Sequence, residues 1–189
     1  MERQKAYFAL SLLMLLLLMP LTPMASSFAE SNNETFAVSG RATTTWSGTV
    51  TLTSDYYVNV QDELLITSCT NVVLSPGIRI YVEGRLTVQG TPVCPIVLSS
   101  SSTTGDHEGI QFNSSSYGRG STVNHMHIED AIFGITMYGS NPILNNVTIF
   151  NPDRVGIDMF GSSSPVIRDL HVEQAGRSVP FQNDWRYGI

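Results

Sequence analysis

Lysine and long stretches of like charge are almost absent from this sequence. Its 189 residues contain 10 Lys and Arg against 16 Asp and Glu, a formal net charge of −6 at pH 7, and the single lysine is Lys5. A protein that binds nucleic acid or an anionic membrane surface presents a basic face to the phosphates. The charge balance therefore argues against both partners. The acidic residues are spread without a block, which is typical of a surface that keeps a protein in solution.

A long hydrophobic run occurs once, at the N-terminus. Arg3 and Lys5 precede an apolar run over residues 10–19, and small residues stand before Glu30. This order is typical of a secretory signal peptide, so we expect residues 1–29 to be removed, with an uncleaved membrane anchor as the alternative. No second run reaches the roughly 20 residues that a spanning helix needs. We expect a secreted or cell-surface protein, periplasmic in a Gram-negative host, with no membrane span after signal removal.

Cysteine is scarce, and the two that occur are Cys69 and Cys94. An exported protein can form disulfides. Their spacing of 25 residues is close to one period of the repeat described below, which would place them on neighbouring turns of the chain. Strands on such turns lie about 4.8 Å apart, within the range that a disulfide spans. We expect a structural disulfide, and the alternative is two buried free thiols.

No stretch carries the apolar stripe of an amphipathic helix over a useful length. Residues 46–98 instead hold short apolar segments separated by Gly, Pro, Asn and Ser, and residues 78–82 alternate strictly between apolar and polar side chains. These are the marks of short β-strands joined by turns. Residues 30–45 are polar and irregular. The sequence therefore predicts a polar lead-in over 30–45 and an all-β domain over 46–189.

Similar segments recur at a period of twenty-odd residues. Gly-Ile pairs stand 25 and then 22 residues apart, and a second short segment recurs at 21 and 23 residues. A period of this length carrying short strands predicts a stacked solenoid, because each repeat must bury its apolar face against its neighbours. The first segments begin at Gly109, Gly134 and Gly156, and the second at Asn124, Asn145 and Arg168.

Aligning the repeats predicts parallel stacking in about six coils. Four columns of the alignment are wholly apolar and are expected to point inward, while the columns between them are polar. Left-handed backbone is expected where the second segment begins, since Asn and Asp tolerate it. The inward columns are Ile110/Ile135/Ile157, Phe112/Met137/Met159, Met126/Val147/Leu170 and Ile128/Ile149/Val172, and the left-handed column is His125/Asn146/Asp169.

Several motifs over about residues 46–175 resemble those of exported right-handed parallel β-helix proteins, which share the pectate-lyase-like superfold. They are the segments 46–48, 75–77, 84–92 and 95–100, and the step from Gly105 to Ile110, in which His107 stands where tryptophan is usual. The resemblance implies an all-β, single-stranded right-handed parallel β-helix. Relatives of this kind include surface proteins, pectin- and alginate-processing enzymes, and NosD-like proteins associated with copper sites.

The residues that could bind a metal are few. His125, His127 and Glu129 lie two apart and could share one face of a strand, and imidazoles suit copper or zinc. The alternative is that they are ordinary polar surface residues. The sequence requires no cofactor, and neither calcium nor copper is supported by a clear ligand cluster.

No residue can be assigned a catalytic role from the sequence. Lyases with this fold use an acidic cluster with a basic residue, but the polar column Gln111/Thr136/Asp158 offers one carboxylate. Asn33 and Asn113 fit the glycosylation pattern, as does Asn146, which is the least suited because a turn is expected there. We therefore expect a non-catalytic scaffold that binds polysaccharide or other cell-envelope components or acts as an adhesin. The alternatives are a fragment of a polysaccharide-active lyase, hydrolase or epimerase, and a NosD-like periplasmic protein.

A fourth Gly-Ile pair, Gly188-Ile189, stands at the end of the sequence and resembles the start of another coil. An uncapped solenoid leaves its last apolar rung and strand edge open. We therefore expect a chain truncated at its C-terminal end. The alternative is that residues 176–189 fold over the last rung as a cap, with Phe181, Trp185 and Tyr187 against it.

Overall fold

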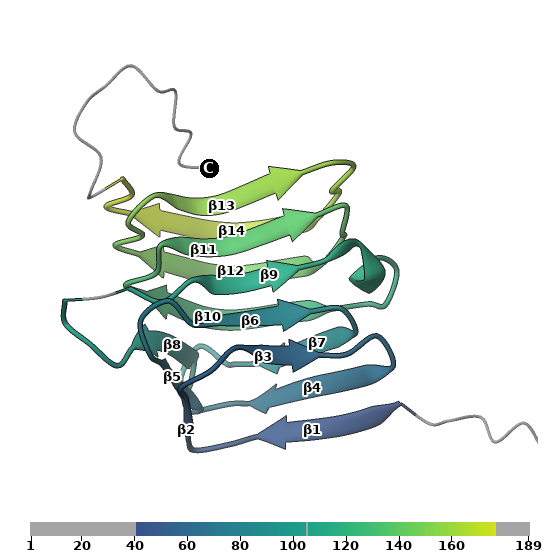
Figure 1. The fold of residues 1–189 in the computed structure, drawn as a ribbon, viewed down its shortest axis with the longest axis horizontal. Helices are drawn as coiled ribbons and strands as arrows, with labels where there is room; N and C mark the ends of the chain where they lie inside the picture. Colours follow the sequence, from purple (N-terminus) through teal and green to yellow (C-terminus); the bar gives the residue numbers. More distant parts are fainter. Residues whose placement is uncertain (1–40, 105, 177–189) are drawn as a thin grey trace, which may run out of the picture. The chain divides into compact units, whose positions relative to one another are not determined.

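The chain winds into a parallel β-solenoid, as Figure 1 shows for a computed structural model that describes residues 41–104 and 106–176. The described strands form a nine-stranded sheet, here sheet A, and a five-stranded sheet, here sheet B. Every strand pair in the two sheets is parallel. The all-β parallel fold predicted from the sequence is therefore confirmed.

Nine short strands make the first three coils, which we call the lower coils. Each lower coil takes two strands from sheet A and one from sheet B. The strands are β1 (Ala42–Trp46), β2 (Thr49–Leu52), β3 (Tyr56–Val58), β4 (Asp62–Thr67), β5 (Asn71–Leu74), β6 (Arg79–Val82), β7 (Arg85–Gln89), β8 (Ile96–Ser100) and β9 (Gly109–Phe112). A 3-10 turn, η1 (Ser114–Ser116), follows β9.

Longer strands make the following coils, which we call the upper coils. They are β10 (Thr122–Glu129), β11 (Phe133–Tyr138), β12 (Ile143–Phe150), β13 (Val155–Phe160) and β14 (Val166–Glu173). β10 joins the two regions, because its first half pairs with β7 and its second half with β8. The described strands thus complete five coils, and β14 begins a sixth.

The apolar columns predicted from the sequence stack in the predicted register. Ile110, Ile135 and Ile157 are strand partners in sheet B, and Met126, Val147 and Leu170 are partners in sheet A. The inward side chains of all coils form one continuous core in which most are fully buried. Burial decreases in the last rung, where Met159 is 48% exposed.

Each long strand of sheet A bends at one residue with left-handed backbone. His125, Asn146 and Asp169 have φ angles of 47°, 51° and 52°, as the sequence predicted for this column. A second left-handed column, Asp130, Asn151 and Gln174, follows the ends of the same strands. One residue therefore turns each long strand within sheet A without a loop, whereas the short segments 130–132 and 151–154 carry the chain from sheet A to sheet B.

The beginning of the β-helix differs from the predicted boundary. β1 begins at Ala42, inside the segment expected to be irregular, and its residues pair in register with β4 from Asp62 onward. Threonines 43–45 favour an extended backbone, so they complete this strand despite their polarity. The expected signal peptide, Asn33 and the C-terminal segment from residue 177 lie outside the described residues. No helix in the described part is long and apolar enough to cross a membrane.

Candidate functional site

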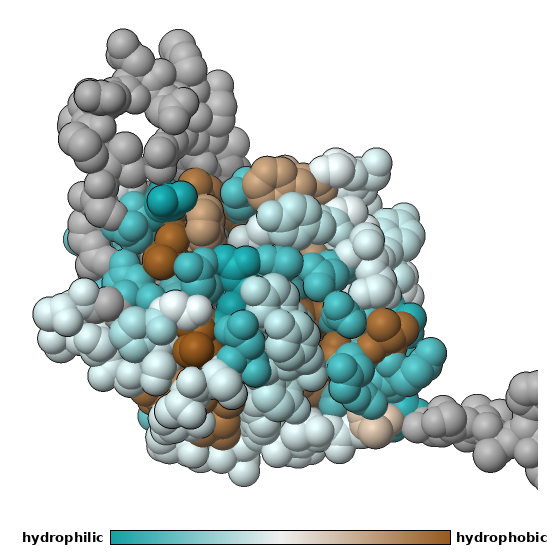
Figure 2. All heavy atoms as spheres, in the orientation of Figure 1, coloured by the Kyte–Doolittle hydropathy of each residue, from teal (hydrophilic) through white to brown (hydrophobic). Residues whose placement is uncertain are grey.

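The outer face of sheet B carries a group of aromatic and polar side chains. Its central column runs through Tyr57, Tyr81, Gln111, Thr136 and Asp158, which are strand partners on successive coils. Their side chains point outward because their strand neighbours occupy the core. Figure 2 shows this face, over which hydrophilic and hydrophobic residues are interspersed.

Two aromatic pairs lie at opposite ends of this face. Tyr57 and Tyr81 stack with ring centroids 4.8 Å apart, and Tyr138 and Phe160 do the same. In each pair, one face of each ring is covered by the other ring. Tyr57 and Phe160, which are 52% and 42% exposed, are the outer members. Each pair therefore exposes ring edges and the outer ring face of Tyr57 or Phe160. Between the two pairs lie the polar residues Gln111, Asn113, Thr136 and Asp158, here called the polar strip.

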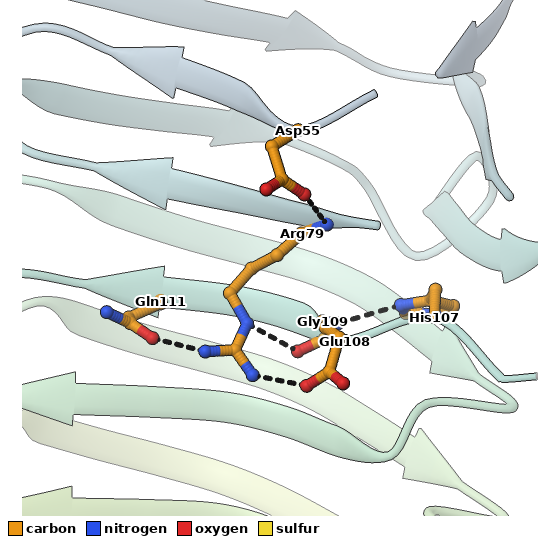
Figure 3. A network of polar contacts seen from close by, with 6 residues as sticks. All are labelled: Asp55, Arg79, His107, Glu108, Gly109 and Gln111. Carbon is orange, nitrogen blue, oxygen red and sulfur yellow. Dashed lines mark hydrogen bonds and ion pairs between the residues drawn. The ribbon is translucent and has the colours of Figure 1, made fainter. Parts of the chain in front are cut away.

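Arg79 is the centre of the polar contacts between these ends. Its side chain extends from β6 to β9, where Nη2 lies 2.5 Å from Glu108 Oε2, Nε donates to the Glu108 carbonyl at 3.2 Å, and Nη1 donates to Gln111 (Figure 3). The backbone N–H of Arg79 donates to Asp55 Oδ1 at 2.9 Å. The guanidinium is therefore held against the next coil by Glu108 and Gln111, and its charge is balanced by the Glu108 carboxylate.

The ring of Phe133 lies between two guanidinium groups. Arg79 and Arg154 approach its centroid to 5.8 Å and 5.7 Å, which is within the range of cation–π attraction. Arg79 also lies 5.7 Å from the ring of Tyr81. These contacts fix the edge of sheet B where each of its strands begins. They also show that the cationic groups of this face are already partly engaged.

Thr136 lies in the middle of the polar strip and is 4% exposed. Its hydroxyl is buried and has no hydrogen-bond partner among the described residues. Gln111 and Asp158 are its strand partners on either side. An unpaired buried hydroxyl costs free energy. Because this oxygen is itself buried, a ligand on the outer face does not reach it.

His107 is fully buried beneath the edge of the same sheet. Its Nδ1 accepts a hydrogen bond from the Gly109 N–H at 2.9 Å, so Nε2 carries the proton and donates to the Glu129 carbonyl at 3.1 Å. Burial lowers the pKa of His107 from 6.5 to about 4. The ring is thus a neutral structural link between β9 and β10.

A separate hollow of about 210 Å³ lies on the outer side of sheet A. Its floor is formed by β10, β12 and β14 and contains His125, His127, Asn146, Thr148 and Asp169. The structure therefore brings His125 and His127 together in one hollow, whereas Glu129 is not part of its lining. Over residues 41–104 and 106–176, no three His, Cys, Asp or Glu side chains gather closely enough to hold a metal ion.

The segment between β7 and β8 overhangs this hollow as a lip. Thr91, Pro92 and Pro95 form its wall. Thr91 and Cys94 exchange two backbone hydrogen bonds of 3.1 Å, and Cys94 is joined to Cys69 with 4.8 Å between the Cα atoms. Two prolines, a tight turn and a covalent link to the coil below therefore hold the lip in place.

Asn113 stands just after β9 and is half-buried. Its Oδ1 accepts a hydrogen bond of 2.8 Å from Gln111, and its Nδ2, the atom that glycosylation would modify, donates to Glu83 at 3.5 Å. The amide is therefore part of the polar strip on sheet B. Glycosylation of Asn113 remains a prediction.

Sequence reasoning found the column Gln111/Thr136/Asp158 on sheet B, but it did not single out Arg79 or the aromatic pairs. The alternation over residues 78–82 places Arg79 and Tyr81 outward, but it gives no sign that Arg79 reaches Glu108 across 29 positions of sequence. That pairing depends on which coil lies next to β6. Only the lower-coil register, which the repeats did not reveal, could have indicated it.

Comparison with known proteins agrees with the topology. A family model described as "Right handed beta helix region" matches residues 57–189. The matched range covers nearly all strands of the described coils. No protein of curated function matches the chain, and neither does any solved structure.

Proposed function

The chain belongs to the right-handed β-helix family, and from this premise we propose that it is an exported scaffold that binds glycan chains along the outer face of sheet B. The observation that carries the proposal is the pair of aromatic stacks, Tyr57/Tyr81 and Tyr138/Phe160, at opposite ends of a polar strip. Sugar rings pair an apolar C–H face with hydroxyl groups, so they suit a surface of exposed aromatic faces and hydrogen-bonding side chains.

The polar strip supports this assignment because its side chains can both donate and accept. Gln111 and Asn113 present half-buried amides, each with a donor and an acceptor atom. Strands of neighbouring coils lie about 4.8 Å apart, so Tyr81 on β6 and Tyr138 on β11 are about 10 Å apart along the axis. The strip therefore has the length for an extended chain rather than for one sugar ring.

The charge of the face favours a neutral glycan. Asp55, Glu83, Glu108 and Asp158 outnumber the two arginines, and Arg79 is already paired with Glu108. A polyuronate would bring further negative charge to these carboxylates, and like charges repel. A neutral polysaccharide would meet no such penalty.

Affinity electrophoresis in native gels tests the proposal. We expect gels containing a neutral polysaccharide such as xylan or hydroxyethyl cellulose to retard the protein more than gels containing pectate. Tyr57→Ala and Phe160→Ala should reduce the retardation. Phe150→Ala is the matched control, because Phe150 is 38% exposed but belongs to β12 in sheet A. Equal mobility in every gel, or unchanged retardation in Tyr57→Ala, would overturn the proposal.

Export is the part of the proposal that rests on the N-terminal sequence. Arg3 and Lys5 before an apolar run are typical of a signal peptide that directs secretion. N-terminal sequencing of the protein from its host should begin at Glu30. A product that still carries residues 1–29 would contradict export by a cleaved signal.

A further inference from the structure

We propose that the hollow between the lip and β10 binds a first-row divalent cation through the imidazoles of His125 and His127. This inference concerns sheet A and does not depend on the glycan face of sheet B. The two imidazoles come from one strand and line one hollow. Neutral imidazole is the commonest protein ligand for zinc, copper and nickel.

Both imidazoles are available for coordination. They are half-buried, and no hydrogen bond or ion pair joins either of them to another residue that the structure describes. The other two histidines of the chain are committed, since His107 bonds through both ring nitrogens and His171 pairs with Glu173. The hollow thus contains two imidazoles with no hydrogen-bond partner among the described residues, whereas each of the other two histidines has at least one.

The backbone places His125 in the hollow at some cost. Its φ of 47° is left-handed, a conformation that Asn and Asp tolerate best. The next two coils use Asn146 and Asp169 at this corner. The first upper coil has a histidine at this corner instead, and histidine also occurs at positive φ more often than most side chains. It adds an imidazole two positions from another.

The charge around the hollow favours a cation. Asp169 lines it, and no Lys or Arg does. Asp169 lies two coils above His125, about 9.6 Å away at the usual strand spacing. It therefore lowers the electrostatic potential of the site without reaching the ion, whose remaining positions would be filled by water. Such a site, with two protein ligands, holds an ion less tightly than a closed four-ligand site.

The neighbouring coil provides variants that leave the fold intact. On the next coil, Asn146 occupies the position equivalent to His125, and Thr148 occupies the position equivalent to His127. His125→Asn and His127→Thr therefore copy side chains that this fold already accepts. His171→Asn is the matched control, because His171 lies in the same outward column as His127 but outside the hollow.

Nickel titration of the untagged protein, followed through its imidazole C–H signals by NMR, tests the proposal. The chain has 4 histidines, so each signal can be assigned by single substitution. Paramagnetic Ni²⁺ should broaden the signals of His125 and His127 first, at one ion per chain. His171→Asn should not change this result, and the His125→Asn/His127→Thr double variant should abolish it.

Three outcomes would overturn the proposal. The first is that no signal broadens at a modest excess of Ni²⁺. The second is that His171 broadens before His125 and His127, which would place the ion on the His171–Glu173 pair. The third is that the double variant binds nickel as well as the wild type does.

Discussion

The lower and upper coils make the corner within sheet A in different ways. In the lower coils the two sheet A strands of each coil are separate, with residues 47–48, 68–70 and 90–95 between them. In the upper coils one strand of eight residues covers both sides and bends at a single left-handed residue. A corner can therefore be made by a loop or by one backbone conformation, and the second way keeps the repeat length nearly constant.

The largest effect is expected where the two regions meet. Gly109 on β9 has a φ of +76°, and a Cβ there would lie 1.9 Å from the Phe133 carbonyl oxygen. Because that oxygen belongs to the backbone of the next coil, it cannot move aside without breaking the stack. Gly109→Ala should lower the free energy of unfolding by about 3–5 kcal/mol, measured by urea denaturation.

The Gly118→Ala variant measures the cost of backbone strain without a steric clash. Gly118 has a similar φ of +69°, but a Cβ there would meet nothing within 4 Å. It should cost about 1–2 kcal/mol, the penalty of a left-handed alanine alone. Equal losses in the two variants would mean that the coils are not packed backbone to backbone at Gly109.

Reduction of the Cys69–Cys94 disulfide should destabilise only the lower coils. Cys69 and Cys94 are separated by 25 residues and join the second and third coils. Closing a loop of this size contributes about 3 kcal/mol. Because solenoid repeats contact only their neighbours, reduction should speed amide hydrogen exchange in β5 and β8 much more than in β12.

The matched control is the Cys69→Ser/Cys94→Ser double variant, which reductant should not change further. Intact mass of the untreated protein should be lower by about 2 Da than that of the reduced protein, from the loss of two hydrogens on forming one disulfide. Uniform acceleration of exchange in both regions would contradict the separation of lower from upper coils.

Acidification should weaken the link that His107 makes between the regions. Its pKa falls from 6.5 in the unfolded chain to about 4 when buried. The unfolded state therefore binds more protons in this window, so the stabilisation is complete above pH 6.5 and is lost as the pH falls toward 4. The loss should be about 3 kcal/mol, at about 1.36 kcal/mol per pKa unit.

The comparison variant is His107→Gln, which cannot gain this proton. Both proteins share the carboxylates that titrate at low pH, so the difference between their stability curves isolates the histidine. The wild-type curve should fall more steeply between pH 6.5 and 4. Parallel curves would show that the imidazole is accessible to protons in the folded protein.

The smallest effect is expected at a corner of the upper coils. Asn146 has a φ of 51° and an exposed side chain. Asn146→Ala should cost about 1 kcal/mol, whereas Asn146→Gly should cost less, because glycine adopts this conformation freely. Thermal unfolding of the two variants measures the difference. A glycine variant less stable than the alanine variant would contradict the backbone explanation of this corner.

The same contrast explains what the sequence could predict. The upper columns, such as Met126/Val147/Leu170, could be aligned because one-residue corners keep the repeat length constant. The lower register could not, because corner segments of different length hide the period. β1 was missed for a related reason, since its threonines resemble a polar linker until β4 pairs with them.

The candidate sites also differ in how far the sequence predicted them, according to whether their residues lie on one strand or on several coils. His125 and His127 were found as a pair because they lie on one strand of the upper coils. The lip that turns their surface into a hollow comes from the irregular segment 91–95, which only the fold brings close. The Tyr57/Tyr81 stack and the Arg79–Glu108 pair join different lower coils, so they require a register that local patterns do not contain. Tyr138 and Phe160, by contrast, directly follow the aligned Met137 and Met159.

Cysteine cross-linking along one outward column tests in-register stacking most directly. Thr148 and His171 are strand partners on adjacent coils, at about 4.8 Å, within reach of a disulfide. Thr148→Cys/His171→Cys should oxidise to an intrachain bond, whereas Thr148→Cys/Glu173→Cys, offset by two residues to about 8 Å, should stay reduced. Efficient bonding of the offset pair together with failure of the aligned pair would contradict the stacked-coil account.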